Sequence, residues 1–177
     1  MGTMRHRHEG FSEHEVAPRV ARVLLADDNG DVRELLTRAL EADGYEVVGF
    51  PDGTALVDYL GDALRPHSDL AVPDIIVTDI RMPGFSGMDV LAALRRVDLQ
   101  VPVILMTAFG NEEVDAEAQR LGAVGLIKKP FDIDDLRTAL RYYLEHGRAE
   151  GERREEERIA GEPRRRPLRR APSGLKH

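Results

Sequence analysis

The sequence predicts a doubly wound α/β domain, in which helices cover both faces of a parallel β-sheet. Five short apolar runs rich in Val, Ile and Leu alternate along the chain with five amphipathic stretches. Each run is apolar almost without interruption, as strands buried on both faces are. Alternating strands and helices favour right-handed crossovers and a parallel sheet. We therefore place one such domain over residues 21–146 of the 177-residue chain.

The predicted strands and helices follow one another in five pairs. The strands are 23–26 (VLLA), 47–50 (VVGF), 75–78 (IIVT), 103–106 (VILM) and 124–127 (VGLI). Between and after them, apolar residues recur at intervals of three and four, the spacing of one helix face. These stripes cover 32–40, 56–63, 88–97, 114–121 and 133–144. Gly44 and Gly122 follow the first and fourth stripes, and glycine commonly ends helices.

The composition excludes several classes of protein. An apolar content of 42% is typical of a globular chain. No apolar stretch is long enough to cross a membrane, and the first 19 residues lack the apolar segment of a secretory signal. The absence of Cys excludes disulfides and thiol chemistry. These features fit a cytoplasmic protein.

Charge divides the chain into three parts. The net charge is −7; residues 148–177 hold ten basic and six acidic side chains, which leaves −11 for residues 1–147. Such an acidic body does not favour DNA binding. We interpret 1–20 as a leader, 21–146 as the domain and 147–177 as a charged, disordered tail. The Arg-rich segment 163–170 (PRRRPLRR) is either a solubilising tail or a basic contact for nucleic acid, anionic lipid or an acidic partner.

Chemically active side chains follow four of the five predicted strands. Asp27 and Asp28 follow the first strand, Asp79 the third, Thr107 the fourth and Lys129 the fifth. In doubly wound folds, ligands bind beyond the carboxyl ends of the strands. Three carboxylates that meet at one sheet edge repel one another, so they stay ionised together only if a cation joins them or a proton is shared. An all-oxygen cluster suits Mg²⁺. Beside such an ion, the Asp79 carboxylate could attack a phosphorus centre, and Lys129 would balance the negative charge that the site gains.

Each residue also has a structural interpretation when taken alone. Asp27 and Asp28 could begin a helix as cap and first-turn acids, and Asp79 could cap a turn. Thr107 could be ordinary packing at a strand end, and Lys129 a solvated surface residue. Their convergence on one sheet edge is what these separate interpretations explain poorly.

The motifs LLADDNG, IIVTDIRMPGFSG, VILMTAFG and GLIKKPF, in this order, resemble the receiver domain of two-component response regulators. The resemblance covers about residues 21–146. It implies a flavodoxin-like (βα)5 fold with strand order 2-1-3-4-5. It also implies that Asp79 is the phosphoacceptor and Thr107 the switch hydroxyl. Lys129 matches the family lysine because it directly precedes Pro130, usually through a cis bond, which leaves Lys128 solvated.

The same resemblance implies the metal ligands. Asp28 corresponds to the direct Mg²⁺ ligand and Asp27 to a neighbour acting partly through water. Asp79 and the backbone carbonyl of Arg81 complete the protein ligands. Two departures stand out: Leu126 replaces the aromatic residue common three positions before the lysine, and the loop 61–74 looks longer than usual. We expect that loop to be solvated and away from the site.

The functional hypothesis is a stand-alone receiver that is a phosphorylation switch and not an enzyme. A sensor histidine kinase or phosphotransfer protein would phosphorylate Asp79, by analogy docking near Val32 and Leu35. The response would move residues 108–146, where a downstream protein or a second copy binds. The alternative is a scaffold of the same fold that works without phosphate. A phosphoester hydrolase would need a second carboxylate two residues after Asp79, where Arg81 stands, and a flavin carrier would need a hydroxyl-rich loop in place of Asp27 and Asp28.

Overall fold

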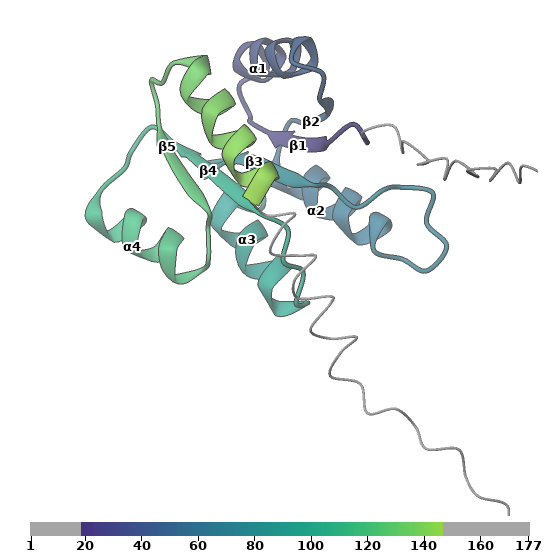
Figure 1. Cartoon of the computed structure of the whole chain (residues 1–177). Coiled ribbons are helices and arrows are strands. Elements are labelled where there is room, and N and C mark those ends of the chain that lie inside the picture. Colours follow the sequence, from purple (N-terminus) through teal and green to yellow (C-terminus); the bar gives the residue numbers. More distant parts are fainter. Residues whose placement is uncertain (1–18, 147–177) are drawn as a thin grey trace, which may run out of the picture.

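The computed structural model describes residues 19–146, and these form a five-stranded parallel sheet with helices on both faces (Figure 1). The predicted tail 147–177 and nearly all of the leader 1–20 lie outside the described residues. The strands are β1 (Arg22–Ala26), β2 (Glu46–Phe50), β3 (Ile75–Asp79), β4 (Val103–Thr107) and β5 (Gly125–Lys128). They pair in the order β2-β1-β3-β4-β5, so the predicted fold and strand order are confirmed.

Helices connect the strands as the apolar stripes predict. They are α1 (Gly30–Ala42), α2 (Gly53–Ala63), α3 (Gly87–Arg96), α4 (Glu112–Arg120) and a C-terminal helix over residues 133–146. Asn29 caps α1 by accepting hydrogen bonds from the amides of Asp31 and Val32. Because Asn29 holds this position, the alternative interpretation of Asp27 and Asp28 as the helix cap is wrong.

Alternation along each strand divides the core into two layers. Val23 and Leu25 of β1 point to one face of the sheet, while Leu24 and Ala26 point to the other. The first layer packs beneath α1 and the C-terminal helix, through Leu36, Leu40, Leu136, Leu140 and Leu144. The second packs against α2 and α3, through Leu56, Leu60, Val90, Leu91 and Leu94. Because a core layer packs on each face, the sheet is held between the helices, and the position of its carboxyl edge is determined.

Each strand differs by one residue at one or both ends from the predicted range: β1 and β2 begin one residue earlier, β3 and β4 end one residue later, and β5 is shifted by one. Asp79 is the last residue of β3, because Ile80 donates its amide to Met106 and continues the ladder by one step. β5 lies one residue later than predicted, because Lys128 pairs in register with Thr107. The predicted loop 61–74 is shorter than expected, because α2 continues to Ala63. The remaining residues 64–74 join α2 to the amino end of β3, the end opposite to Asp79, so the loop lies away from the site as expected.

Candidate functional site at the carboxyl edge of the sheet

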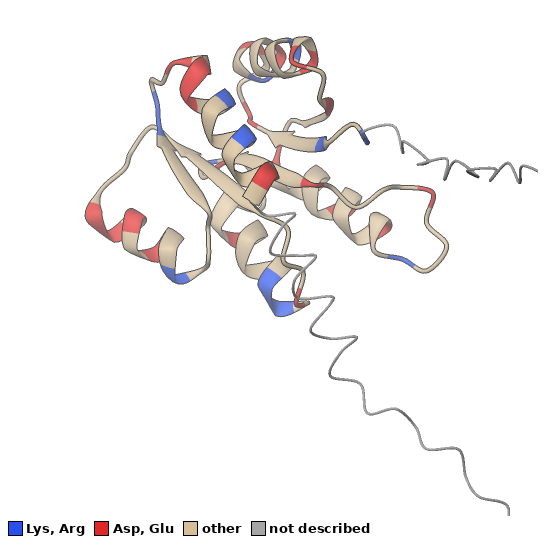
Figure 2. Cartoon of the chain, in the orientation of Figure 1, with Lys and Arg blue, Asp and Glu red and all other residues tan. Residues whose placement is uncertain are grey.

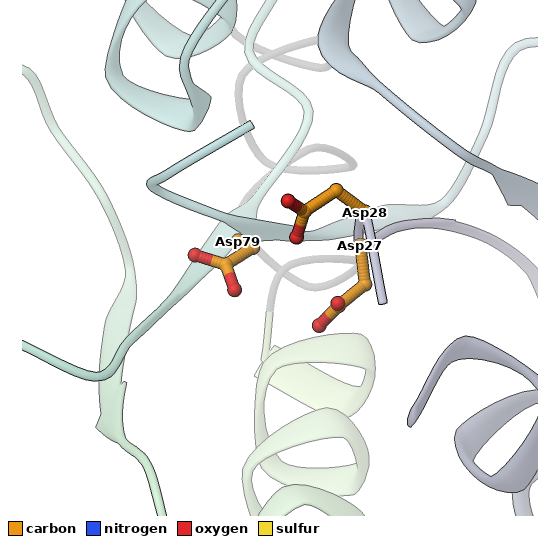
Figure 3. Close-up of side chains that lie close together, drawn as sticks. All are labelled: Asp27, Asp28 and Asp79. Carbon is orange, nitrogen blue, oxygen red and sulfur yellow. The ribbon is translucent and has the colours of Figure 1, made fainter. Parts of the chain in front are cut away.

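Three carboxylates gather where β1 and β3 end (Figure 3). Asp27 and Asp28 directly follow β1, and Asp79 ends β3 beside it. One oxygen from each of the three lies within 4.8 Å of the others. Asp27 has no exposed surface and Asp79 is 7% exposed, whereas Asp28 is open to solvent. The structure therefore brings together the acids that the sequence analysis placed at this edge.

Short-range hydrogen bonds fix the two buried acids. The Asn29 amide donates to Asp27 Oδ1 over 2.9 Å, and the Arg81 amide donates to Asp79 Oδ1 over 2.8 Å. The Arg33 guanidinium donates to the Asp27 carbonyl over 2.6 Å, which ties α1 to the end of β1. Neither Asn29 nor Arg33 was predicted from the sequence to belong to the site. A signal for Asn29 was present, since Asn is among the preferred caps before a helical stripe.

Lys129 joins the two buried carboxylates. Its Nζ donates to Asp27 Oδ2 over 2.6 Å and also pairs with Asp79 Oδ2. Burial alone would lower the pKa of Lys129. The hydrogen bonds and charges of Asp27 and Asp79 outweigh burial and raise that pKa above its ordinary value. The lysine is therefore an ammonium at neutral pH, and the expected cis bond between Lys129 and Pro130 is confirmed.

Thr107 lies at the end of β4 and is almost fully buried. Its hydroxyl accepts a hydrogen bond from the Phe109 amide over 3.1 Å, which folds the start of the β4–α4 loop (108–111) back over the strand end. Leu126 is half-buried and packs against the core layer beneath α2 and α3. The aliphatic residue is thus directed into the fold, where the family often has an aromatic one.

Two side chains that the sequence analysis missed form part of the rim. The Arg81 guanidinium carbon lies 4.3 Å from the centroid of the Phe109 ring, a cation–π contact between the β3–α3 and β4–α4 loops. Phe109 is 62% exposed, so this ring stands in solvent above the sheet edge. A partnership between two loops leaves no pattern in either segment of sequence.

Gly87 lets α3 begin directly against the backbone of Asp79. A Cβ atom on Gly87 would lie 2.5 Å from the Asp79 carbonyl oxygen, closer than real Cβ atoms approach. The residue before it, Ser86, caps α3 in a reciprocal capping box with Asp89. Asp79 is therefore enclosed on the α3 side by backbone.

The donor set at this edge suits a hard divalent cation. Carboxylate oxygens are the ligands that Mg²⁺ prefers, and the exposed Asp28 gives the cluster an open side towards water. A doubly wound sheet that carries an acidic cluster, a buried hydroxyl and a lysine at its carboxyl edge defines a class of phosphoacceptor signalling domains.

Comparison with known proteins specifies the family. The family model described as "Response regulator receiver domain" matches residues 23–141. Sporulation initiation phosphotransferase F of Bacillus subtilis is 31% identical over 123 residues, which cover 70% of this chain and 93% of the relative. The chain belongs to the receiver domain family of two-component response regulators. The resemblance inferred from the four motifs is confirmed.

Other similar proteins differ in length. Regulatory protein AtoC of Escherichia coli is 35% identical over 126 residues, which cover 71% of this chain but only 26% of the relative. The structure of the chemotaxis protein CheY4 of Vibrio cholerae is 28% identical with a TM-score of 0.60, covering 70% of this chain and 98% of that one. The similarity to AtoC therefore covers about a quarter of that protein's length.

The family sets the general function. Receiver domains are phosphoacceptor switches that use an acidic pocket for Mg²⁺ and act in two-component signalling. Within residues 19–146, none of the helices has the length and apolar character to span a membrane.

Proposed function

We propose that this receiver accepts a phosphoryl group on Asp79, with Mg²⁺ as cofactor, and thereby changes which protein it binds. The observation that supports this most directly is the position of Lys129, whose ammonium pairs with both Asp27 and Asp79 while the three carboxylates lie within 4.8 Å. A carboxylate with only a structural role would not need a second buried carboxylate and a third, solvent-exposed carboxylate beside it.

We propose that Asp27, Asp28, Asp79 and the Arg81 carbonyl hold the metal. Asp28 is the exposed member and is the natural direct ligand, whereas Asp27 already accepts hydrogen bonds from Asn29 and Lys129. Mg²⁺ bound there supplies positive charge that offsets the charge of phosphoryl oxygens.

The proposed reaction forms an acyl phosphate. A carboxylate oxygen of Asp79 attacks phosphorus, and the bond from phosphorus to the imidazole nitrogen of the donor breaks. The nitrogen leaves with the bonding electron pair and gains a proton from solvent. Lys129 stays protonated and moves its charge from the carboxylate to the phosphoryl group, and the Thr107 hydroxyl donates to a phosphoryl oxygen.

The donor in this proposal is a histidine kinase or phosphotransfer protein. An open, mainly apolar groove of about 470 Å³ lies directly beside Lys129. Val32 and Leu35 of α1 contribute to it, together with Pro130 and Phe131 after β5. Leu35 is 66% exposed and adds to the apolar surface of this groove. A helical donor that covered this groove would bring its histidine to the site.

The predicted output is a shift of the region 108–146, where a downstream protein or a second copy of the chain docks. We further propose that the chain is a switch with no metabolic substrate, so model phosphomonoesters should not be turned over.

Intact-mass analysis after incubation with acetyl phosphate tests the proposal. With Mg²⁺, the protein should gain one phosphoryl group; with EDTA, or in Asp79→Asn, it should gain none. Asp58→Asn is the matched control, because it removes an exposed carboxylate of α2 outside the cluster. A phosphoryl group retained by Asp79→Asn would refute the assignment. An unmodified wild type that remains folded would favour the phosphate-independent scaffold.

A further inference from the structure

Helix α4 is weakly anchored to the rest of the domain. Of its nine residues only Ala118 is buried, whereas α3 buries Val90, Leu91 and Leu94. Its first turn carries Glu112, Glu113 and Asp115, and the acidic residues of α4 are red on the ribbon of Figure 2. Since little apolar surface holds α4, individual polar contacts weigh more in its position than they do for α3.

Lys128 of β5 reaches across to α4. Its Nζ lies 3.0 Å from Asp115 Oδ2. The other oxygen, Oδ1, is enclosed and has no hydrogen-bond partner among the residues that the structure describes. Lys128 is therefore the one cation that pairs with this carboxylate among the described residues. The expectation that Lys128 is simply solvated is therefore corrected: about half of the side chain is exposed, but the ammonium is paired.

The stem of Lys128 also covers the β4–α4 loop. A Cβ atom added to Gly110 would lie 2.5 Å from Lys128 Cε, 2.8 Å from Cδ and 3.1 Å from Cγ. The lysine stem thus lies flat on the glycine backbone. The Lys128 side chain therefore contacts the β4–α4 loop through its stem and α4 through its ammonium.

The place of Lys128 in the sheet connects these contacts to the site. Lys128 is the register partner of Thr107, and the next amide, that of Lys129, donates to the Thr107 carbonyl over 2.7 Å. The residue lies between the proposed switch hydroxyl and the lysine that contacts Asp79. Its side chain extends from there to the loop and to α4.

We infer that Lys128 is a positioning residue that holds the β4–α4 loop and α4 in the arrangement described here, through its stem on Gly110 and its ion pair with Asp115. This inference rests on the proposed function for its role in signalling. The ion pair opposes the displacement of Thr107 and α4, so its strength sets how readily the chain adopts the phosphorylated arrangement. Partly exposed ion pairs shift such an equilibrium about 2- to 5-fold.

Hydrogen exchange of the α4 amides tests the inference in the unmodified protein. Lys128→Met keeps the stem and removes the charge, and Asp115→Asn removes the partner. Each should speed exchange over residues 112–121 by about 2- to 5-fold, and the double variant should show no further increase, as expected for a coupled pair. Lys128→Arg should restore slow exchange. Glu113→Gln is the matched control, because it also removes an acid from the first turn of α4.

Added salt gives a second readout that a purely steric role would not produce. High salt should accelerate exchange in the wild type towards the rate of Lys128→Met and should change that variant little. Unchanged exchange in Lys128→Met would overturn the inference, as would an equal acceleration in Glu113→Gln or strictly additive effects in the double variant.

A phosphorylation assay separates this inference from the proposed function. With acetyl phosphate and Mg²⁺, the initial rate of modification should rise in Lys128→Met by a factor no larger than the change in exchange. If wild type takes up no phosphoryl group, the proposed function fails while the exchange result still decides whether Lys128 positions α4. If hydrogen exchange shows that Lys128→Met loosens α4 but this variant takes up the phosphoryl group at the wild-type rate, the signalling role of Lys128 is refuted.

Discussion

Replacing Lys129 with methionine should destabilise the domain far more than an ordinary surface substitution. Methionine keeps most of the length of the side chain but removes the ammonium that Asp27 and Asp79 share. Carboxylate oxygens within 4.8 Å of one another then repel by about 3 kcal/mol at an effective dielectric of about 20. Leaving a buried charge without its partner costs about 3–5 kcal/mol. We expect Lys129→Met to lower the free energy of unfolding by about 3 kcal/mol at neutral pH in EDTA.

Urea unfolding followed by circular dichroism measures this loss, and Lys128→Met is the matched control. Both variants exchange neighbouring lysines for methionine, but the Lys128 side chain is 54% exposed and its ion pair is worth about 0.2–1 kcal/mol. Mg²⁺ should restore part of the stability of Lys129→Met, because a cation that binds only the folded state stabilises it by RT ln(1 + [Mg²⁺]/Kd).

A loss below about 1 kcal/mol in Lys129→Met, or equal losses in the two variants, would contradict this expectation. Either result would show that the acids at this edge do not depend on the ammonium. A large loss that Mg²⁺ fails to reduce would count against a cation site formed by Asp27, Asp28 and Asp79.

Three further predictions concern stability and use the same unfolding assay. The pKa of Lys129 is raised in the folded state, so its ion pairs stabilise the domain fully below the ordinary lysine pKa of about 10.4 and lose this effect only as pH rises through the higher folded pKa. The difference in free energy of unfolding between wild type and Lys129→Met should therefore stay constant from neutral pH to about pH 10 and then shrink. A decline of that difference at lower pH would contradict the raised pKa. Asn29→Ala should cost about 1 kcal/mol because it removes the α1 cap while keeping the backbone amide that binds Asp27; no loss would mean that the cap is dispensable. Gly53→Ala should cost about 1–3 kcal/mol because its Cβ would lie 1.8 Å from the Phe85 carbonyl oxygen. Gly61→Ala in the same helix, where a Cβ would meet no described atom within 4 Å, should instead stabilise by about 0.5–1 kcal/mol; the opposite order would contradict the packing at Gly53.

The fold could be predicted from sequence because its determinants are local and repeated. Continuous aliphatic runs and helical stripes specify buried strands and amphipathic helices, and their alternation leaves few topologies. The carboxyl edge follows from topology alone, which is why Asp27, Asp28, Asp79 and Lys129 could be placed together before any contact was known. Their chemical roles remain proposals, supported by family membership and geometry.

The remainder of the site could not be read from the sequence because it depends on contacts between distant loops. Arg81 and Phe109 pack across two loops, and Lys128 pairs with Asp115 across an element boundary. Neither partner has a residue type or spacing that indicates the other. Surface lysines are usually solvated, so only the folded structure distinguishes Lys128 from that common case.

The close approach of Gly87 to the Asp79 carbonyl has a consequence for engineering receivers. Backbone on the α3 side leaves no room for Asp79 to retreat, whereas α4 buries a single residue. Variants that retune the response should therefore be sought by diversifying residues 108–121 while 79–87 are kept constant. In directed evolution of this chain, we expect Gly87 to reject nearly every other residue and α4 to accept many substitutions, so that new partner specificities can be selected while the chemistry proposed for Asp79 is kept.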